Sequence, residues 1–147
     1  MRTAFASALI AAAVTCAAAP KAPAQAQYMA QSDSQLSLVK RELGPSYYET
    51  RQMINGRFAR PEPQNQNFNW TRGTYVIAAA GDNDVTAITL RLFDANDHIV
   101  AADTSGSKTP RITVAVAQNG AFFRLEYTIT GCNQYPCYMS VMPYGRR

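Results

Sequence analysis

The feature that most constrains the fold is a series of short segments between residues 74 and 142 in which apolar and polar residues alternate. Every second residue is apolar in 88–92, 112–116 and 123–129, which is the period of a β-strand with one buried face. Turn-forming residues separate the segments at intervals of about 8 to 12 residues, and no helical crossover long enough to join parallel strands lies between them. The pattern predicts an all-β domain, an antiparallel jelly-roll-like β-sandwich of about eight strands.

One short amphipathic helix is predicted before the strands. Ser34 suits the N-cap position, Leu36, Val39 and Leu43 share one helical face, and Gly44 with the following proline ends the run. A helix of about ten residues is marginal alone, so we expect it to pack on the sandwich.

The first 26 residues have the layout of a signal peptide. Arg2 supplies a positive start, residues 4–19 are apolar or small with no acidic residue, and Ala24 and Ala26 form a small-residue cleavage site. The apolar run is shorter than the roughly 20 residues of a membrane-spanning helix. We predict cleavage after Ala26, a mature chain beginning at Gln27, and a periplasmic or secreted location.

Lipidation of Cys16 is the alternative fate of this segment, although Thr15 and the residues before it match a lipidation motif poorly. In the mature chain we expect a flexible lead over 27–33 and a single domain over 34–147. Within that domain the helix should cover about 34–43 and the sandwich about 48–144, with a strand near 51–58 and a loop over 61–67.

Charge excludes some partners. Loss of Arg2 and Lys21 with the signal peptide leaves 12 basic and 10 acidic residues, a net charge of +2 instead of +4. The basic residues are scattered, which does not favour nucleic-acid binding. No later apolar run is long enough to cross a membrane. For an exported chain the expected partner is an envelope polymer or protein of unknown identity.

The two cysteines of the mature chain, Cys132 and Cys137, are predicted to form a disulfide, because exported proteins use paired cysteines in this way. The four residues between them are turn formers, so the bond would clamp a tight connection between the last two strands. A redox-active pair is the alternative, but the spacing is not C-x-x-C and no helix start follows to stabilise a thiolate.

The stretch from residue 73 to residue 144, with GTYVIAAAGDNDV, LRLFDANDHIVAADTS, NGAFFRLEYTI and CNQYPCYMSVMPY, resembles the bacterial pre-peptidase C-terminal domain family and its stand-alone periplasmic relatives. That family has an Asp-rich loop before a strand, a D-x-x-G-x turn and a later Gly-x-Tyr strand. Asp94 begins the matching turn, Asp97 stands where the family has glycine, and Gly120 matches the late strand. Ala87 and Thr89 replace two carboxylates of the family's first strand. The resemblance implies a non-catalytic β-sandwich that accompanies secreted enzymes or binds envelope or matrix polymers.

Asp and Asn residues between the predicted strands supply oxygen ligands of the kind that Ca²⁺ prefers. They do not form an EF-hand loop, and the same residues are the ordinary components of β-turns. We therefore expect structural turns and no cofactor. The metal-site alternative would use Asp82, Asp84, Asp94, Asn96 and Asp97.

Aromatic residues give a second candidate site, a stacking platform for sugars or peptides. Large aromatic residues in a small β-domain are more often part of the core, and that interpretation competes with the platform. The binding candidates are Tyr48, Trp70 and Tyr135, within a group that also includes Tyr47, Phe68 and Tyr138.

No catalytic residue is predicted. His98 is the single histidine, and no nucleophile motif accompanies it. The expected function is an exported, non-catalytic binding or structural module of the cell envelope or extracellular space. The alternative is a small secreted hydrolase or enzyme inhibitor, which should have a deep pocket with convergent polar groups of shifted pKa. A binding module should have a shallow groove or exposed aromatic residues.

Overall fold

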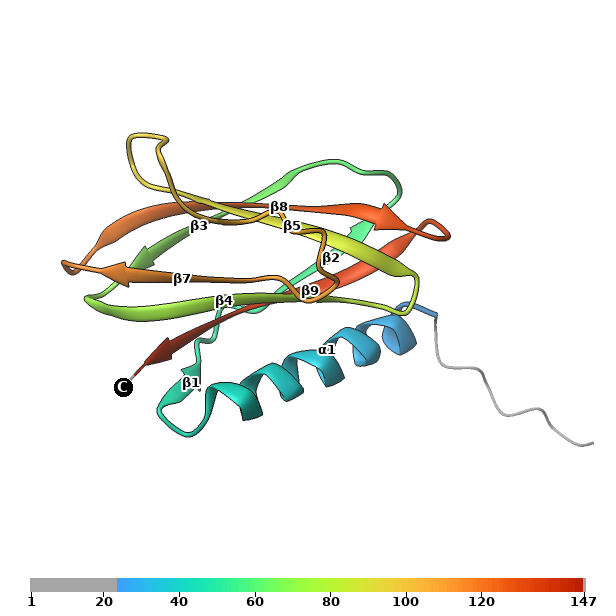
Figure 1. The fold of residues 1–147 in the computed structure, drawn as a ribbon, viewed down its shortest axis with the longest axis horizontal. Coiled ribbons are helices and arrows are strands. Elements are labelled where there is room, and N and C mark those ends of the chain that lie inside the picture. Colours follow the sequence, from blue (N-terminus) through green and yellow to red (C-terminus); the bar gives the residue numbers. More distant parts are fainter. Residues whose placement is uncertain (1–23, 147) are drawn as a thin grey trace, which may run out of the picture.

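The computed structural model describes residues 24–146, and this part of the chain contains one helix and nine strands (Figure 1). Cys16 and nearly all of the predicted signal peptide lie outside the described residues. The elements are α1 (Ala24–Leu43), β1 (Tyr47–Glu49), β2 (Ile54–Phe58), β3 (Gln64–Trp70), β4 (Gly73–Gly81), β5 (Val85–Phe93), β6 (Ile99–Asp103), β7 (Arg111–Val116), β8 (Ala121–Cys132) and β9 (Cys137–Arg146).

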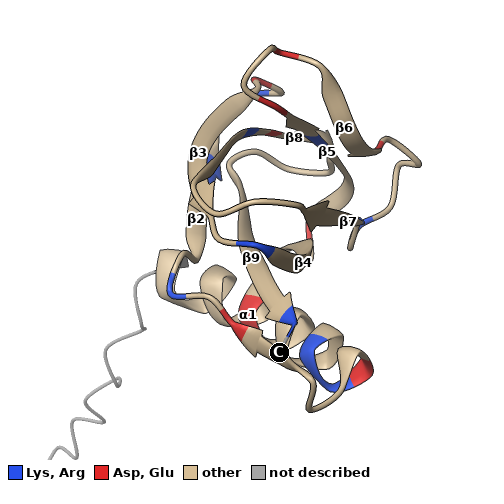
Figure 2. Ribbon diagram, turned by 90° about the vertical axis from the view of Figure 1, so that its left-hand side faces the viewer, with Lys and Arg blue, Asp and Glu red and all other residues tan. Residues whose placement is uncertain are grey.

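The strands form two antiparallel sheets that pack face to face. One sheet has the order β1-β9-β4-β7, with β2 also paired to β9, and the other has the order β3-β8-β5-β6. In Figure 2 the two sheets form separate layers, and α1 lies beneath the layer that contains β9 and β4. The predicted two-sheet, antiparallel architecture with one helix is confirmed.

Strand pairing follows a nested pattern along the chain. β5 pairs with β6, β4 with β7, β3 with β8, and β2 with β9. The chain therefore behaves as one long hairpin whose turn lies between β5 and β6, folded so that its pairs fall alternately in the two sheets. The additional pairs β5–β8 and β4–β9 join these pairs within each sheet.

The apolar residues of the alternating segments face the core, as their period predicts. Ile88, Leu90 and Leu92 of β5 are fully buried, and Leu125 and Ile129 of β8 are buried beside them. These side chains meet those of the facing sheet and form one core. Regular alternation placed them correctly because a shift of one residue would expose the whole apolar set to water.

Helix α1 covers the outer face of the β4–β9 sheet. Leu36 and Val39, the predicted apolar face, are buried against Ala78 and Ala80 of β4. The small alanine side chains on the outer face leave room for the helix, and the phenol of Tyr144 donates a hydrogen bond to the Leu36 carbonyl at 3.0 Å.

The helix is twice as long as predicted, and residues 27–33 are helical instead of forming a flexible lead. Polar contacts extend its docked face toward the N-terminus. The hydroxyls of Ser32 and Ser140 lie 2.8 Å apart, and the Gln31 side-chain oxygen accepts a hydrogen bond from the backbone N–H of Asn83. Helical periodicity in apolar residues alone does not reveal such contacts. No helix among residues 24–146 has the length and apolar character needed to cross a membrane.

The strand count and the start of β3 also differ from the prediction. There are nine strands instead of about eight, because a three-residue strand, β1, precedes β2 at the edge of its sheet. The segment 61–67 was expected to be a loop, but β3 begins at Gln64. Asparagine and glutamine are poor strand formers, yet β3 is an edge strand whose polar residues at 65–67 face solvent, and pairing with β8 determines its conformation.

Candidate functional site

Cys132 and Cys137 are bonded, as predicted, and close the connection between β8 and β9. Asn133 in this connection donates its backbone N–H to the Asp84 carbonyl at 2.9 Å. The β8–β9 turn is thereby attached to the β4–β5 turn at the same end of the sandwich.

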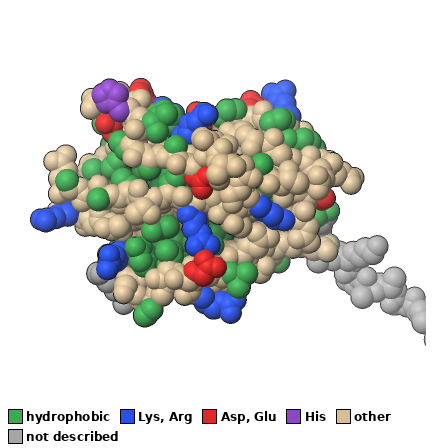
Figure 3. Space-filling view, viewed as in Figure 1, with side chains coloured by type: hydrophobic (Ala, Val, Ile, Leu, Met, Phe, Trp, Pro, Cys, Tyr) green, Lys and Arg blue, Asp and Glu red, His purple; other side chains and the backbone are tan. Residues whose placement is uncertain are grey.

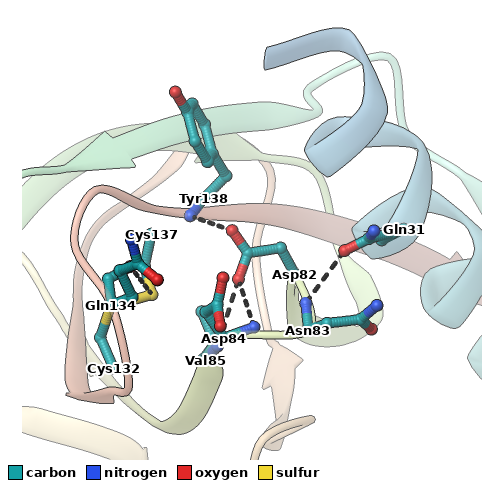
Figure 4. Close-up of a disulfide and its surroundings, with 9 residues drawn as sticks. All are labelled: Gln31, Asp82, Asn83, Asp84, Val85, Cys132, Gln134, Cys137 and Tyr138. Atoms are coloured by element: carbon teal, nitrogen blue, oxygen red, sulfur yellow. Dashed lines mark hydrogen bonds between the residues drawn. A yellow bond between two sulfur atoms is a disulfide. The ribbon is translucent and has the colours of Figure 1, made fainter. Parts of the chain in front are cut away.

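Asp82 organises the β4–β5 turn and is fully buried. One carboxylate oxygen accepts hydrogen bonds from the backbone N–H groups of Asp84 and Val85, at 3.0 and 3.1 Å. The other accepts one from the N–H of Tyr138 in β9, at 2.9 Å (Figure 4). With three backbone donors bound, this carboxylate has a structural role as the link between the turn and β9.

Asp84 has different surroundings, although it lies only two positions away. Figure 4 shows it beside the turn that carries Gln134. Its backbone N–H donates a hydrogen bond to the Asp82 carboxylate, and its backbone carbonyl accepts one from Asn133. Its own carboxylate has no hydrogen-bond or ion-pair partner within residues 24–146. It lines a surface hollow of about 230 Å³, which we call the aromatic hollow. The lining residues are Tyr28, Asp84, Gln134, Tyr135, Pro136 and Tyr138.

Four segments that are distant in sequence build the aromatic hollow: the start of α1, the β4–β5 turn, the β8–β9 turn and the start of β9. Tyr28 and Tyr138 stack with ring centroids 5.1 Å apart and ring planes 8° from parallel. Tyr138 is 6% exposed, while Tyr28 and Tyr135 remain half-exposed. The hollow therefore offers aromatic surface beside one carboxylate and one amide.

Tyr28 is the wall residue that sequence reasoning missed, because it lies in the segment expected to be flexible. A signal for it exists in the helical spacing: Tyr28, Ser32, Leu36, Val39 and Leu43 recur at intervals of three or four residues, which places them on one helix face. Serine in this series concealed the continuation of the docked face.

The charges around the hollow are unbalanced, because no lysine or arginine lines it. Arg57 is the residue opposite Tyr138 in the β2–β9 ladder. Arg57 lines a different hollow, however, together with Arg60 and Glu62, which form an ion pair at 2.9 Å. The Asp84 carboxylate is thus the charged group of the aromatic hollow.

The other aromatic candidates lie elsewhere. Trp70 is 3% exposed and stacks between Phe68 and Tyr75 in the core, so the expectation of a binding role for it is corrected. Strand alternation turns it inward beside Phe68. Tyr48 is 37% exposed, and its ring lies over Gly145, where a Cβ atom would approach the ring carbon Cζ to 2.6 Å.

The predicted metal candidates do not converge. Asp82 and Asp84 precede β5, whereas Asp94, Asn96 and Asp97 follow it, and nine extended residues span about 30 Å. Backbone hydrogen bonds, first that from His98, hold the pKa of Asp94 below its ordinary value. Asp97 has a φ of 60° and forms an ion pair with Arg124 at 2.8 Å. Within residues 24–146, no three Asp, Glu, His or Cys side chains are grouped as a metal site would require.

His98 lies on the surface between β5 and β6. The exposed imidazole of His98 lies 3.6 Å from the Asp94 carboxylate. A further hollow, about 200 Å³, lies between α1 and β9 and is lined by Asp33, Ser37, Glu49, Tyr144 and three apolar residues. Burial, and then the nearby charge of Glu49, raises the pKa of Tyr144 to about 12, so its phenol stays protonated at neutral pH.

On the face seen in Figure 3, basic and acidic side chains are dispersed among apolar and neutral ones. Charge on this face is not concentrated in a patch of one sign. Comparison of the sequence with protein-family models and with curated proteins finds no match.

Proposed function

We propose that this chain is an exported, non-catalytic binding module of the cell envelope or extracellular space, and that it takes its ligand in the aromatic hollow. The observation that carries this proposal is the convergence of three tyrosines, Asp84 and Gln134 from four separate segments on one hollow. Aromatic side chains with a few polar groups are the usual lining of a ligand site.

The alternative, a small hydrolase or an enzyme inhibitor, has less support. The pKa of Asp94 is lowered, first by the backbone hydrogen bond from His98, and the pKa of Asp103 is lowered because hydrogen bonds from Ser105 and Arg111 outweigh the opposing effect of burial. The high pKa of Tyr144 comes from burial, and its phenol is committed to the Leu36 carbonyl. These groups lie apart from the aromatic hollow, whereas catalytic acids and bases gather at one site.

Export is part of the proposal. The disulfide is compatible with an oxidising compartment, and cleavage after Ala26 would leave the docked part of α1 intact from Gln27 onward. Tyr28 would then be the second residue of the mature protein. Mass spectrometry of the exported protein should give an unmodified N-terminus at Gln27, and a lipid-modified Cys16 there would contradict this.

We further propose a jelly roll related to the pre-peptidase C-terminal domain family. The nested pairing of β2 to β9 with β5 to β6 innermost supports the jelly roll, which folds eight strands into two sheets. The φ of 60° at Asp97 supports the family relation, because this is the backbone conformation that the family's glycine would adopt readily.

The mature protein and two variants test the site. We expect immobilised protein to retain a component of an envelope fraction, and Tyr135→Ala to lose most of that retention because it removes an exposed wall of the hollow. Phe122→Ala is the matched control, since Phe122 is an exposed aromatic residue of the other sheet, at 38% exposure. Equal loss in both variants, or none in Tyr135→Ala, would contradict the assignment of the site.

A further inference from the structure

We infer that the ligand group bound in the aromatic hollow is an organic cation, specifically a quaternary ammonium group. This inference deepens the proposed function, because it rests on the same hollow and names the chemical class that the hollow recognises. It follows from three properties of the lining: its charge, its aromatic surface and its size.

The side chains that line the hollow carry one negative charge and no positive charge. Asp84 is half-buried, and its carboxylate binds no donor and no cation within the described residues. The other carboxylate of the same turn, that of Asp82, is saturated by three backbone N–H groups. No basic side chain lines the hollow, so a positively charged ligand would supply the missing counter-charge.

The aromatic surface favours a cation that is weakly hydrated. The faces of tyrosine rings attract a cation electrostatically, and quaternary ammonium groups are recognised by aromatic side chains in this way. Tyr28 and Tyr135 are partly exposed, and the ring of Tyr138 stacks on that of Tyr28. Pro136 adds apolar surface that methyl groups can contact, whereas a strongly hydrated primary ammonium would lose water there without enough acceptors in return.

The size of the hollow limits the ligand to a head group. Its volume of about 230 Å³ is below the usual range for a complete drug-sized ligand, about 300 to 1,000 Å³. A trimethylammonium group with a short chain fits this limit. Free choline and the head group of phosphatidylcholine present the same chemistry and are separated by experiment.

The probe is choline chloride, titrated into the mature protein at constant ionic strength and followed by backbone amide NMR shifts. We expect saturable shifts at residues 84, 134, 135, 137 and 138, with a dissociation constant of about millimolar. The neutral isostere of choline, in which carbon replaces the nitrogen, should bind about tenfold more weakly. Equal affinity for the two compounds, or shifts only outside these residues, would overturn the inference.

Three variants separate the contributions. Asp84→Asn should weaken choline about tenfold and leave the neutral isostere unchanged, because it removes charge but keeps the shape. Tyr135→Leu should also weaken choline selectively, because it removes the ring but keeps apolar surface. Glu126→Gln, on the other sheet, is the control and should change neither. Unchanged choline affinity in Asp84→Asn would overturn the inference.

Co-sedimentation with phosphatidylcholine vesicles identifies the source of the group. Binding to vesicles that Asp84→Asn abolishes assigns the lipid head group, and binding to free choline alone assigns a soluble ligand. The inference fails independently of the proposed function: if choline does not bind but Tyr135→Ala still prevents envelope retention, the site stands and the ligand class is wrong.

Discussion

Asp82 and Asp84 lie two positions apart in one turn and have different surroundings. Both read as turn formers or calcium ligands in the sequence, since asparagine and aspartate serve both purposes. The difference arises from β9, whose Tyr138 N–H donates a hydrogen bond to the Asp82 carboxylate, while Asp84 lines the aromatic hollow. The residue type alone therefore did not show which of the two aspartates has a structural role and which lines the candidate site.

We predict that Asp82→Ala lowers the free energy of unfolding by about 2 to 4 kcal/mol. The substitution leaves three backbone N–H groups without their charged acceptor. Asp84→Ala is the matched control and should change stability by less than about 0.5 kcal/mol, as for surface substitutions generally. Urea denaturation measures both, and equal effects would show that the two carboxylates are not differentiated as described.

Tyr144 predicts the response of stability to alkaline pH. Burial raises its pKa from 10.0 to about 12, so its contribution to stability is complete below pH 10.0 and is lost as pH rises through about 12. This increase in pKa corresponds to about 2 to 3 kcal/mol of folding free energy. Tyr144→Phe should lack this alkaline loss and should lose about 1 kcal/mol at neutral pH with its hydrogen bond to Leu36. The measurement is the free energy of unfolding of both proteins from neutral pH to about pH 12. The same alkaline loss in Tyr144→Phe as in the unmodified protein would contradict the prediction.

At the scale of elements, α1 is held by one face. Leu36 is 4% exposed against the sheet, whereas Leu38 is 49% exposed on the same helix. We predict that Leu36→Ala destabilises the protein by about 2 to 4 kcal/mol. Leu38→Ala makes the same chemical change and should cost less than about 0.5 kcal/mol. Comparable losses in thermal unfolding would mean that the helix does not dock through the face that contains Leu36.

The β8–β9 connection is an element closed by a short covalent ring. We predict that Cys132→Ser lowers stability by about 2 kcal/mol, because a ring this short restricts the unfolded chain only modestly. The fold should persist, with unchanged far-ultraviolet circular dichroism, since the core between the sheets does not depend on this bond. Free thiols at both cysteines in protein purified from the periplasm would contradict the bond itself.

At the scale of the whole molecule, the acidic turns lie at opposite ends of the sandwich and cannot share one ion. We therefore predict little or no stabilisation by calcium. An ion present at about one hundred times its dissociation constant would add roughly 2.7 kcal/mol, which is a shift of about ten degrees or more in a domain of this size. Melting curves with chelator and with excess Ca²⁺ decide the matter, and a shift near that size, lost when Asp82 and Asp84 become Asn, would refute the prediction.

The architecture was predictable wherever one face of a strand is buried. Alternation identified β5, β7 and β8 with their inward residues, because exposing that face would cost the burial of every apolar side chain on it. The prediction failed in the first half of β3 and in the first half of α1, where polar residues dominate. In both places the conformation depends on pairing or docking with a distant segment.

The sequence by itself determined the fold class, the apolar face of the helix at Leu36 and Val39, and the pairing of Cys132 with Cys137. These features are predictable because hydrophobic period, turn composition and cysteine spacing can each be recognised within a short stretch of sequence. Tertiary structure alone decided that Trp70 is a core residue and that Tyr28 and Tyr138 stack beside Asp84. The reason is that a site built from four distant segments has no period, and only the packing of α1 on the sheet brings its residues together.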